Sequence, residues 1–489
     1  MALDALSHRP DGPSDHAESR HQHARLPQSR GWCPLGPDCS ECRPALRPRR
    51  SGNGGRDNKM KRAGRGFEYL AGCGLVAALA LAPTQWSFTA MRGVNVSPAD
   101  LLLLPVAACW LLGVLINGRW RRLIPFRRPA CGIAPHPFWR FWPHALLALI
   151  AALSVGVAAD RAAAVKEVVQ ITLYLIVAPL LVFDFVRPAD TLEPRRLALV
   201  LAALLAPLLI NVSVAFIQYV QPRLPDFAIR GLFLNRNVLG GFLALTAPIL
   251  FGLVADSRSR LLRGGALLVL LVAMTVILAG AAYAAITLVL LLLAAWKGAR
   301  LFLTTAVCLT LWQVCVLPRL PRENDLAHFR SVALYDAAGV PERRYPEWQA
   351  AASLILTHPL TGVGAGNYQR EIGQYYDVVP NATGPCEPDT QNLHLVLAAS
   401  LGLPALFVWM AVLGRAFCAA AGAARGRPSW QTGLAGGLMA GIGAFALTAL
   451  WHPLLVRGIG ISLAAIVALA HAMTRCHGAL SVPNTAEPA

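Results

Sequence analysis

Charged side chains are scarce in this sequence of 489 residues. Asp, Glu, Lys and Arg make up 14% of it, whereas about 25% is usual in a soluble domain. Acidic residues are scarcer than basic ones: 26 Asp and Glu stand against 44 Lys and Arg, which leaves a net charge of +18. Hydrophobic residues account for 55% of the chain. This composition excludes an ordinary soluble domain and predicts a polytopic membrane protein.

Signals for disulfides, metals and nucleic acid are also lacking. Of the cysteines, only Cys386 falls in a long segment predicted to lie outside the membrane, so no internal disulfide is expected there. Cys33, Cys39 and Cys42 have no second pair at zinc-finger spacing. Basic residues gather between apolar runs, which is positive-inside patterning and not a nucleic-acid footprint. We expect no metal, no cofactor and no nucleic acid.

Apolar runs long enough, or nearly so, to cross roughly 30 Å of membrane hydrocarbon recur along the chain. They begin near Glu68, Ala99, His144, Glu167, Leu197, Asn237, Gly265, Tyr283, Leu301, Gln391, Gln431 and Gly458. The chain is therefore predicted to be all-α, a bundle of about 12 transmembrane helices. Within residues 265–296 we expect two helices in a tight hairpin around Gly280, because one helix of that length would exceed the bilayer even when tilted.

Basic residues indicate the orientation of these helices. If twelve helices alternate, the connections that carry Arg119, Arg187, Arg260, Arg300 and Arg425 all fall on one side. That side is predicted to be the cytoplasm, which places both termini inside the cell.

The same pattern divides the chain into five segments. Residues 1–66 are predicted to be a disordered extension, because they lack the apolar content needed to offset chain entropy; a true start at Met60 is an alternative. Residues 67–317 and 391–473 form the two parts of the bundle, and residues 474–489 form a cytoplasmic tail. Residues 318–390 form a long external loop containing short helices, and loops of that length are commonly functional.

Two arginines stand directly before a predicted amphipathic helix in this loop. The helix is expected to begin near Pro346 and to end at His358. Its free N–H groups, together with the guanidinium groups of Arg343 and Arg344, would form an anion site. The alternative is that both arginines are solvated or pair with Glu342.

Arg230 and three glycines are further candidates. Arg230 precedes a helix that opens at Asn237, so it is expected at the outer mouth of the bundle, where an arginine needs an anionic partner or snorkels to lipid headgroups. Gly362, Gly364 and Gly366 follow a helix and not a strand, which argues against a dinucleotide loop. We predict that they permit positive φ angles and close backbone approach.

The stretch from Arg344 to Met410 carries the most specific pattern. It reads RYPEWQAAASLILTHPLTGVGAGNYQ and then, after a polar interval, DTQNLHLVLAASLGLPALFVWM. This stretch resembles the signature region of the O-antigen ligase and O-antigen polymerase superfamily. The matching positions are Arg344, Trp348, His358, Pro359, Leu360, Gly362, Val363, Gly364, Gly366, Asn367, Tyr368, Asn392, Leu395, Leu401 and Gly402. A weaker match begins at Arg230 and includes Asn237.

The resemblance implies a polysaccharide enzyme of the bacterial cell envelope. It would transfer a glycan from undecaprenyl diphosphate to a lipid or growing glycan, as in lipopolysaccharide biosynthesis, at the outer face of the cytoplasmic (inner) membrane and without a metal. Arg230, Arg343 and Arg344 would hold the diphosphate, with Arg230 and Arg344 converging on one pocket. Ligase and polymerase both stay open. The alternative of another class is a non-catalytic protein of the same fold that binds or transports a lipid-linked or anionic solute.

The sequence departs from the family pattern at the catalytic position. Where the family has a His before Asn392, this chain has Gln391, which cannot act as a base at neutral pH. His394 is predicted to replace it and to point into the same pocket, because a base must come within about 3 Å of the acceptor hydroxyl or reach it through a water. Asp389 is the fallback base. Alternatively, His394 is a core or interfacial residue.

Overall fold

The computed structural model describes most of the chain beyond its N-terminal region. The described residues are 54–84, 88–91, 94–119, 137–188, 191–225, 228–255, 257, 259–319, 344–376, 390–455 and 458–474. Residues 1–53, Arg343, Cys386 and Asp389 lie outside this set. The first helix begins at Gly54, inside the segment predicted as an extension.

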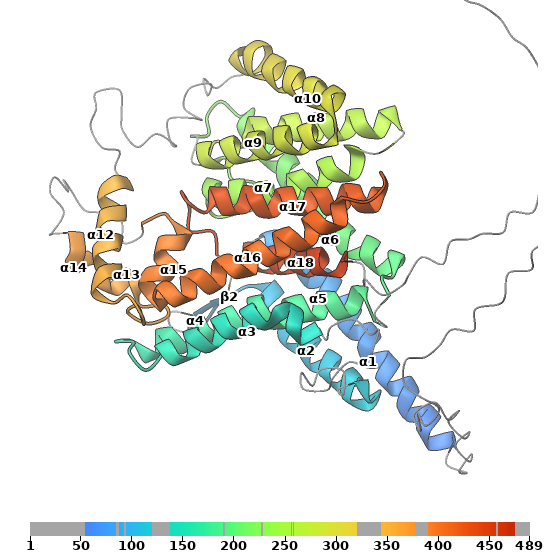
Figure 1. Ribbon diagram of the computed structural model, residues 1–489, viewed down its shortest axis with the longest axis vertical. Coiled ribbons are helices and arrows are strands. Elements are labelled where there is room, and N and C mark those ends of the chain that lie inside the picture. Colours follow the sequence, from blue (N-terminus) through green and yellow to red (C-terminus); the bar gives the residue numbers. More distant parts are fainter. Residues whose placement is uncertain are drawn as a thin grey trace, which may run out of the picture. The chain divides into compact units, whose positions relative to one another are not determined.

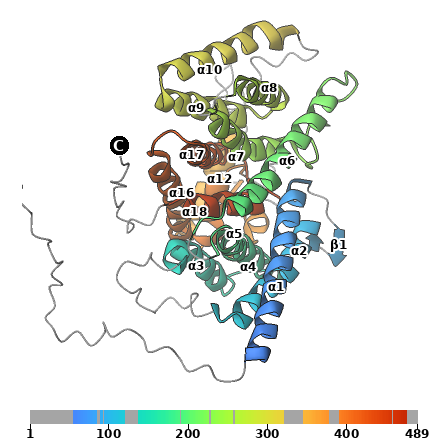
Figure 2. The same ribbon diagram turned by 90° about the vertical axis from the view of Figure 1, so that its right-hand side faces the viewer.

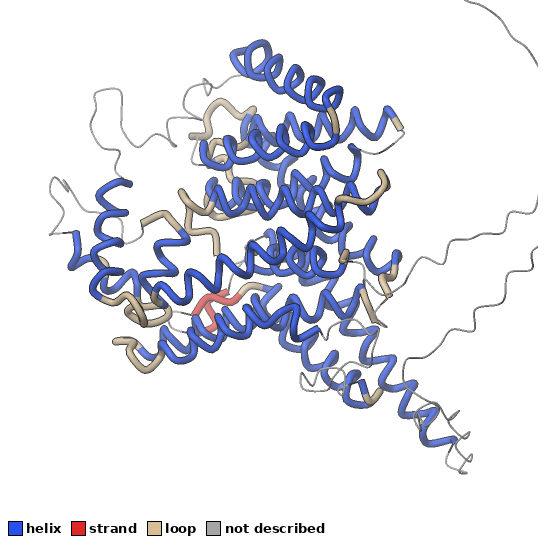
Figure 3. Tube along the Cα trace, viewed as in Figure 1, coloured by secondary structure: helices blue, strands red, loops and turns tan. Residues whose placement is uncertain are grey.

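Helices dominate the described residues, as the all-α prediction requires (Figure 3). One antiparallel pair of short strands, β1 and β2, is the exception. The elements are α1 (Gly54–Leu81), η2 (Ala82–Thr84), β1 (Phe88–Met91), β2 (Val94–Val96), α2 (Pro98–Ile116), α3 (Pro137–Ser154), α4 (Arg161–Thr172), η4 (Leu173–Val177), α5 (Ala178–Val186), α6 (Pro194–Tyr219), α7 (Arg236–Ala255), α8 (Arg260–Val276), α9 (Gly280–Lys297), α10 (Ala299–Leu311), η6 (Trp312–Val316), η7 (Leu317–Arg319), α12 (Arg344–Thr357), α13 (Tyr368–Glu371), α14 (Gly373–Tyr376), α15 (Leu393–Leu401), α16 (Leu403–Ala424), α17 (Trp430–Thr448) and α18 (Ile459–Ala472).

Eight helices in the described part are long and apolar enough to cross a membrane, judged by length and composition. They cover Arg62–Thr84, Pro98–Ile116, Arg161–Val186, Pro194–Val220, Arg236–Ala255, Gly280–Lys297, Ala299–Arg319 and Leu403–Ala424. Two shorter apolar helices cover Arg140–Ser154 and Ile459–Ala472. A helix satisfies its own backbone hydrogen bonds, so it is the form that such apolar runs adopt in lipid. A multi-pass membrane protein is therefore supported, while the number of about twelve helices stays a prediction.

Helices α7 and α17 pack side by side at the centre of the described bundle (Figure 1). In the most apolar 18-residue window of α7, 72% of the residues are buried, against 11% in the helix that begins with α10. Gly433, Gly437 and Gly441 recur every fourth residue along α17 and meet the backbone of α7. A Cβ at Gly437 would lie 2.7 Å from the Pro248 carbonyl oxygen. The two backbones are in direct contact because this stripe has no side chains.

The predicted hairpin around Gly280 is confirmed. Helix α8 ends at Val276 and α9 begins at Gly280. Two polar side chains near this break bind the residues that follow α10. Thr275 Oγ1 accepts from Trp312 Nε1 at 2.9 Å, and the Tyr283 hydroxyl donates to Gln313. Figure 2 shows α10 at the edge of this group, next to α9.

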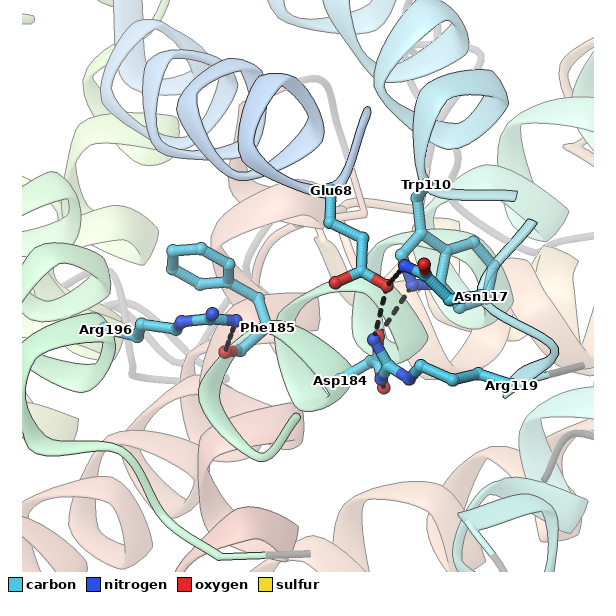
Figure 4. A network of polar contacts seen from close by, with 7 residues as sticks. All are labelled: Glu68, Trp110, Asn117, Arg119, Asp184, Phe185 and Arg196. Carbon is cyan, nitrogen blue, oxygen red and sulfur yellow. Dashed lines mark hydrogen bonds and ion pairs between the residues drawn. The ribbon is translucent and has the colours of Figure 1, made fainter. Parts of the chain in front are cut away.

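Arg119, just after α2, joins α1 and the end of α5, which lie far apart in the sequence (Figure 4). Its guanidinium donates to Glu68 Oε1 of α1 at 2.8 Å and also to Asp184 of α5. Trp110 Nε1 donates to the same Asp184 carboxylate at 2.9 Å. The middle of α1, at Glu68, therefore meets the end of α2 and the end of α5.

Other arginines on the predicted cytoplasmic side gather at the end of α18. Arg140 of α3 donates to the His471 carbonyl oxygen at 3.0 Å, and Arg187, just after α5, donates to the Ala472 carbonyl oxygen at 2.9 Å. These bonds satisfy carbonyl groups at a helix C-terminus, where cations are favourable. Arg140 and Arg187 thus lie at the same end of the bundle, at the C-terminus of α18.

The membrane helix expected to open at Gln391 is interrupted. Helix α15 ends at Leu401, Gly402 has a φ of +85°, and α16 begins at Leu403. A turn from forty residues upstream docks into the break, since Leu403 donates its N–H to the Pro359 carbonyl oxygen at 2.8 Å. The spanning helix is α16, and α15 is a short helix beside the signature turn.

Candidate functional site

The glycine turn of the signature region docks against the last turn of α15. Val363 N–H donates to the Ala399 carbonyl oxygen at 3.0 Å, and Gly364 N–H donates to that of Ser400 at 2.9 Å. Gly362, Gly364 and Gly366 have φ angles of +61°, +96° and +65°. A Cβ at Gly364 would lie 2.6 Å from that of Ala158. The predicted positive φ angles and close backbone approach are confirmed.

Asn367 fastens this turn to the connection before α4. Its side chain is buried, with 1% exposed. Its Oδ1 accepts from Asp160 N–H at 2.7 Å, and its Nδ2 donates to the carbonyl oxygens of Asp160 at 3.1 Å and Ala365 at 2.8 Å. Ala365 N–H in turn donates to Ser154 Oγ, at the end of α3, at 3.0 Å. One buried amide therefore joins segments 207 residues apart in the chain.

The fixed connection determines where α4 begins. Asp160 is the N-cap, and its Oδ1 accepts from Ala163 N–H at 3.0 Å. Such a cap satisfies an N–H group that the helix itself leaves unpaired. Glu167 follows two helical turns later and is half-buried. The signature turn thus controls the position of the Glu167 carboxylate.

Trp348 holds α12 in place from the other side. Its Nε1 donates to the Thr390 carbonyl oxygen at 3.0 Å, and its ring meets that of Trp451 edge-on, with centroids 6.1 Å apart. Helix α12 also contributes to a small apolar cluster that is separate from the main core. This cluster contains Ala350, Ala351, Leu354, Ile355, Tyr368, Ile372, Tyr376, Ala398 and Ala399. The residues around the site are therefore packed as a unit.

The start of α15 contains a capped end and a strained residue. Asn392 is the N-cap, and its Oδ1 accepts from the N–H groups of His394 at 3.0 Å and Leu395 at 3.1 Å. Gln391 has a φ of +50°, the one positive value among non-glycine residues in the part that the structure describes. Such backbone strain is concentrated at functional sites in proteins. Here it falls at the position where the resembled family has its catalytic His.

These elements enclose a cavity of about 300 Å³. It lies between α4, the residues after the glycine turn, α15 and the segment that follows α17. Its lining residues are Glu167, Ile171, Ala365, Gly366, Tyr368, Gln369, Leu393, Val396, Leu397, Ser400, Leu401, Pro453 and Leu455. Apolar side chains dominate, with a few polar groups among them, as is usual for a small-molecule site. Among the lining residues that the structure describes, Glu167 has the one carboxylate.

His394, the first of the two predicted bases, is not among the described residues that line the cavity. His394 is 9% exposed, and its Nε2 lies 3.2 Å from the Ala446 carbonyl oxygen of α17. A carbonyl oxygen only accepts, so Nε2 carries the proton and Nδ1 keeps its lone pair. Asp389 lies outside the described residues. A catalytic role for either residue therefore stays a prediction.

Of the three arginines predicted to bind the diphosphate, the structure describes the side chain of Arg230. Arg230 is exposed, and its Nη1 donates to the Leu234 carbonyl oxygen at 3.0 Å. It is not among the residues that line the cavity. Arg344 is the first residue of α12, but the structure does not describe its side chain, and Arg343 lies outside the described residues. Asn237, in the first turn of α7, is half-buried. Convergence of Arg230 and Arg344 stays a prediction.

Two residues near the site were not expected from the sequence. Glu167 was expected only as the start of an apolar run, and the fold brings it to the signature cavity. His452 is buried next to Pro453, a lining residue, and follows the Trp451 ring that contacts Trp348. A second His-Pro pair after an apolar run was the available signal for His452.

The fold and the site together define a class: a multi-pass helical membrane protein with a partly apolar cavity beside one carboxylate. No protein-family model matches the chain, and no curated protein matches its sequence.

Proposed function

We propose that this protein transfers a glycan from an undecaprenyl-diphosphate carrier to the hydroxyl group of a lipid or glycan acceptor, as an O-antigen ligase or polymerase does. The observation that supports the proposal most is the cavity of about 300 Å³, whose lining includes Gly366, Tyr368 and Leu401 of the resembled pattern. Asn367, Trp348 and Asn392 each fix a segment that borders it. Residues of the resembled pattern thus hold together a site with one carboxylate and an apolar wall.

The reaction needs a base and a site for the leaving group. The acceptor oxygen attacks the anomeric carbon, the bond from that carbon to the diphosphate oxygen breaks, and the diphosphate leaves with the electron pair. The hydroxyl proton passes to a base. We propose Glu167 for this role, because it lines the cavity and its carboxylate can accept the proton of an acceptor hydroxyl. His394, through Nδ1, is the next candidate.

The leaving diphosphate needs positive charge. Arg230, Arg343 and Arg344 remain the proposed ligands, since arginine can bind phosphate oxygens through two parallel hydrogen bonds. The Arg230 segment lies at the same end of α7 as the cavity. Leu454, between the lining residues Pro453 and Leu455, would meet a Cβ at Gly241 in the first turns of α7.

We further propose that this end of the bundle faces the outside of the inner membrane, with about twelve spanning helices and both termini in the cytoplasm. The support is the gathering of Arg119, Arg140 and Arg187 at the other end, where positive-inside patterning would place the cytoplasm. The site would then be open to lipid-linked glycans on the outer leaflet.

Glycan transfer by membranes that contain single variants tests the assignment of the base. Glu167→Gln preserves size and removes the negative charge, so we expect transfer to fall on the order of 10²-fold or more. Lys166→Gln is the matched control, because Lys166 is exposed and does not line the cavity. His394→Ala is measured in parallel, and each variant is compared for membrane level and for binding of undecaprenyl diphosphate.

The outcomes separate the possibilities. Loss of transfer in the Glu167 variant with retained undecaprenyl diphosphate binding supports the proposal. Loss in the His394 variant alone makes His394 the base and refutes the role of Glu167. Full transfer in both variants would refute both assignments. Absence of transfer in the unaltered protein, with binding intact, favours the non-catalytic protein that binds or transports a lipid-linked solute.

A further inference from the structure

A second cavity lies at the opposite end of α7 from the signature cavity. It has a volume of about 440 Å³ and opens between α8 and α10. It is lined by Phe251, Val254, Ala255, Arg260, Arg263, Gly264, Leu267, Leu270, Arg300, Leu301, Thr304 and Thr305. A 20-residue helix spans about 30 Å, so this site is remote from the signature cavity.

Three arginines from two helices line this cavity. Arg260 and Arg263 come from the first turn of α8, and Arg300 comes from the first turn of α10. All three are exposed. No carboxylate occurs among the lining residues that the structure describes. Asp256, in the same connection, lies outside the described residues. The lining of this cavity therefore has a net positive charge.

The remaining lining residues change character along the helix axis. Leu267 and Leu270 follow Arg263 by four and seven residues, which places them about 6 and 10 Å further along α8. Phe251 and Leu301 add apolar surface from α7 and α10. The cavity is thus cationic at one end and apolar at the other, and it is bordered by three helices of the bundle, α7, α8 and α10.

We propose that this cavity binds one anionic phospholipid, with the headgroup phosphate among Arg260, Arg263 and Arg300 and an acyl chain along Leu267 and Leu270. Guanidinium groups bind phosphate oxygens through charge-assisted hydrogen bonds. Basic pockets between membrane helices are suited to anionic headgroups. The proposal does not depend on glycan transfer.

Arginine at the cytoplasmic ends of helices also serves topology alone. Arg425 and Arg427, which follow α16, are exposed and line no part of this cavity. They therefore serve as controls for arginines that only set the orientation of a helix in the membrane. Arg260, Arg263 and Arg300 differ from Arg425 and Arg427, because they line a cavity that also has room for a lipid chain.

Two neighbouring glycines give a matched pair of variants. Gly264 lines the cavity and Gly265 does not, and a Cβ added at either position would meet nothing within 4 Å. Gly264→Phe should fill the cavity without disturbing the arginines, whereas Gly265→Phe adds the same ring elsewhere. Neither change introduces a clash at Cβ, so both proteins should fold.

The full chain in detergent is titrated with phosphatidylglycerol, and lipid adducts are counted by native mass spectrometry. We expect one retained phosphatidylglycerol, at least tenfold weaker retention in Gly264→Phe, and no change in Gly265→Phe. Each Arg→Gln change in the cavity should weaken retention about fivefold, equivalent to roughly 1 kcal/mol for one basic residue near an anionic lipid. Arg425→Gln should leave retention unchanged.

Titrations with phosphatidylcholine and with inorganic phosphate test whether the site selects an anionic phospholipid. Equal retention of phosphatidylcholine would overturn the proposal, because the arginines would then select nothing. Suppression of phosphatidylglycerol binding by millimolar phosphate would show that the site binds free phosphate instead and would also overturn it. Equal loss in Gly264→Phe and Gly265→Phe would place the lipid outside this cavity.

Discussion

Replacement of Asn367 by Ala should loosen the turn that positions Glu167. The side chain is buried and makes three hydrogen bonds, two with the backbone of Asp160 and one with that of Ala365. Truncation leaves these backbone groups without their partner. At about 1 kcal/mol for each bond, we expect a loss of about 3 kcal/mol. For a chain of this size, that lowers the midpoint of thermal unfolding by about 3 °C.

The local consequence is more specific than the loss of stability. Hydrogen exchange should accelerate in peptides that contain Asp160 and Ala365, because the amide of Asp160 loses its acceptor. Asn211→Ala is the matched control: Asn211 is equally buried, and its side chain accepts from Leu232 N–H at 2.9 Å and donates to the Pro207 carbonyl oxygen at 3.0 Å. That variant should also be less stable.

The two variants should differ in where exchange changes. Faster exchange around Asp160 in Asn367→Ala and around Leu232 in Asn211→Ala is the expected result. The view that Asn367 fixes the start of α4 would be refuted by either of two results. One is a thermal midpoint of Asn367→Ala within about 1 °C of that of the unaltered protein, and the other is equal hydrogen exchange around Asp160 in both variants.

Two further predictions concern the opposite end and the topology. Arg119→Ala should destabilise the protein by about 2 kcal/mol, which is less than the cost for a fully buried pair, because its ion pairs are partly exposed. Arg196→Ala should cost less than about 1 kcal/mol, because the contact of Arg196 with Glu193 is more exposed. Denaturation curves of both variants check this difference, and equal losses of stability would contradict it. An impermeant thiol reagent should label Cys386 in intact cells but leave Cys386→Ser unlabelled at that site. Labelling of Cys386 only after permeabilisation would reverse the proposed topology.

The helices were predictable because their cause is local. An apolar run in lipid must be helical whatever it packs against, so the segments near Glu68, Asn237 and Gly458 all became helices. The break near Gly280 followed from length, and the positive φ of Gly364 followed from the chemistry of glycine.

The parts that escaped prediction depend on contacts between distant segments. Gly402 interrupts the helix expected from Gln391, because a turn forty residues upstream docks there. Glu167 lies at the cavity on a helix whose start is bonded to Asn367 through Asp160, two hundred residues earlier in the chain. No periodicity or local motif reports such a pairing.

The glycine stripe of α17 limits how the two cavities can communicate. Gly433, Gly437 and Gly441 leave the backbones of α7 and α17 in contact, so sliding or rotation of one helix would drive side chains into the other backbone. This pair is therefore expected to stay fixed while ligands come and go. Helix α10, which is little buried, has the freedom to move. A lipid bound beside α10 would then exchange with the bilayer without disturbing the end of the protein that contains the signature cavity.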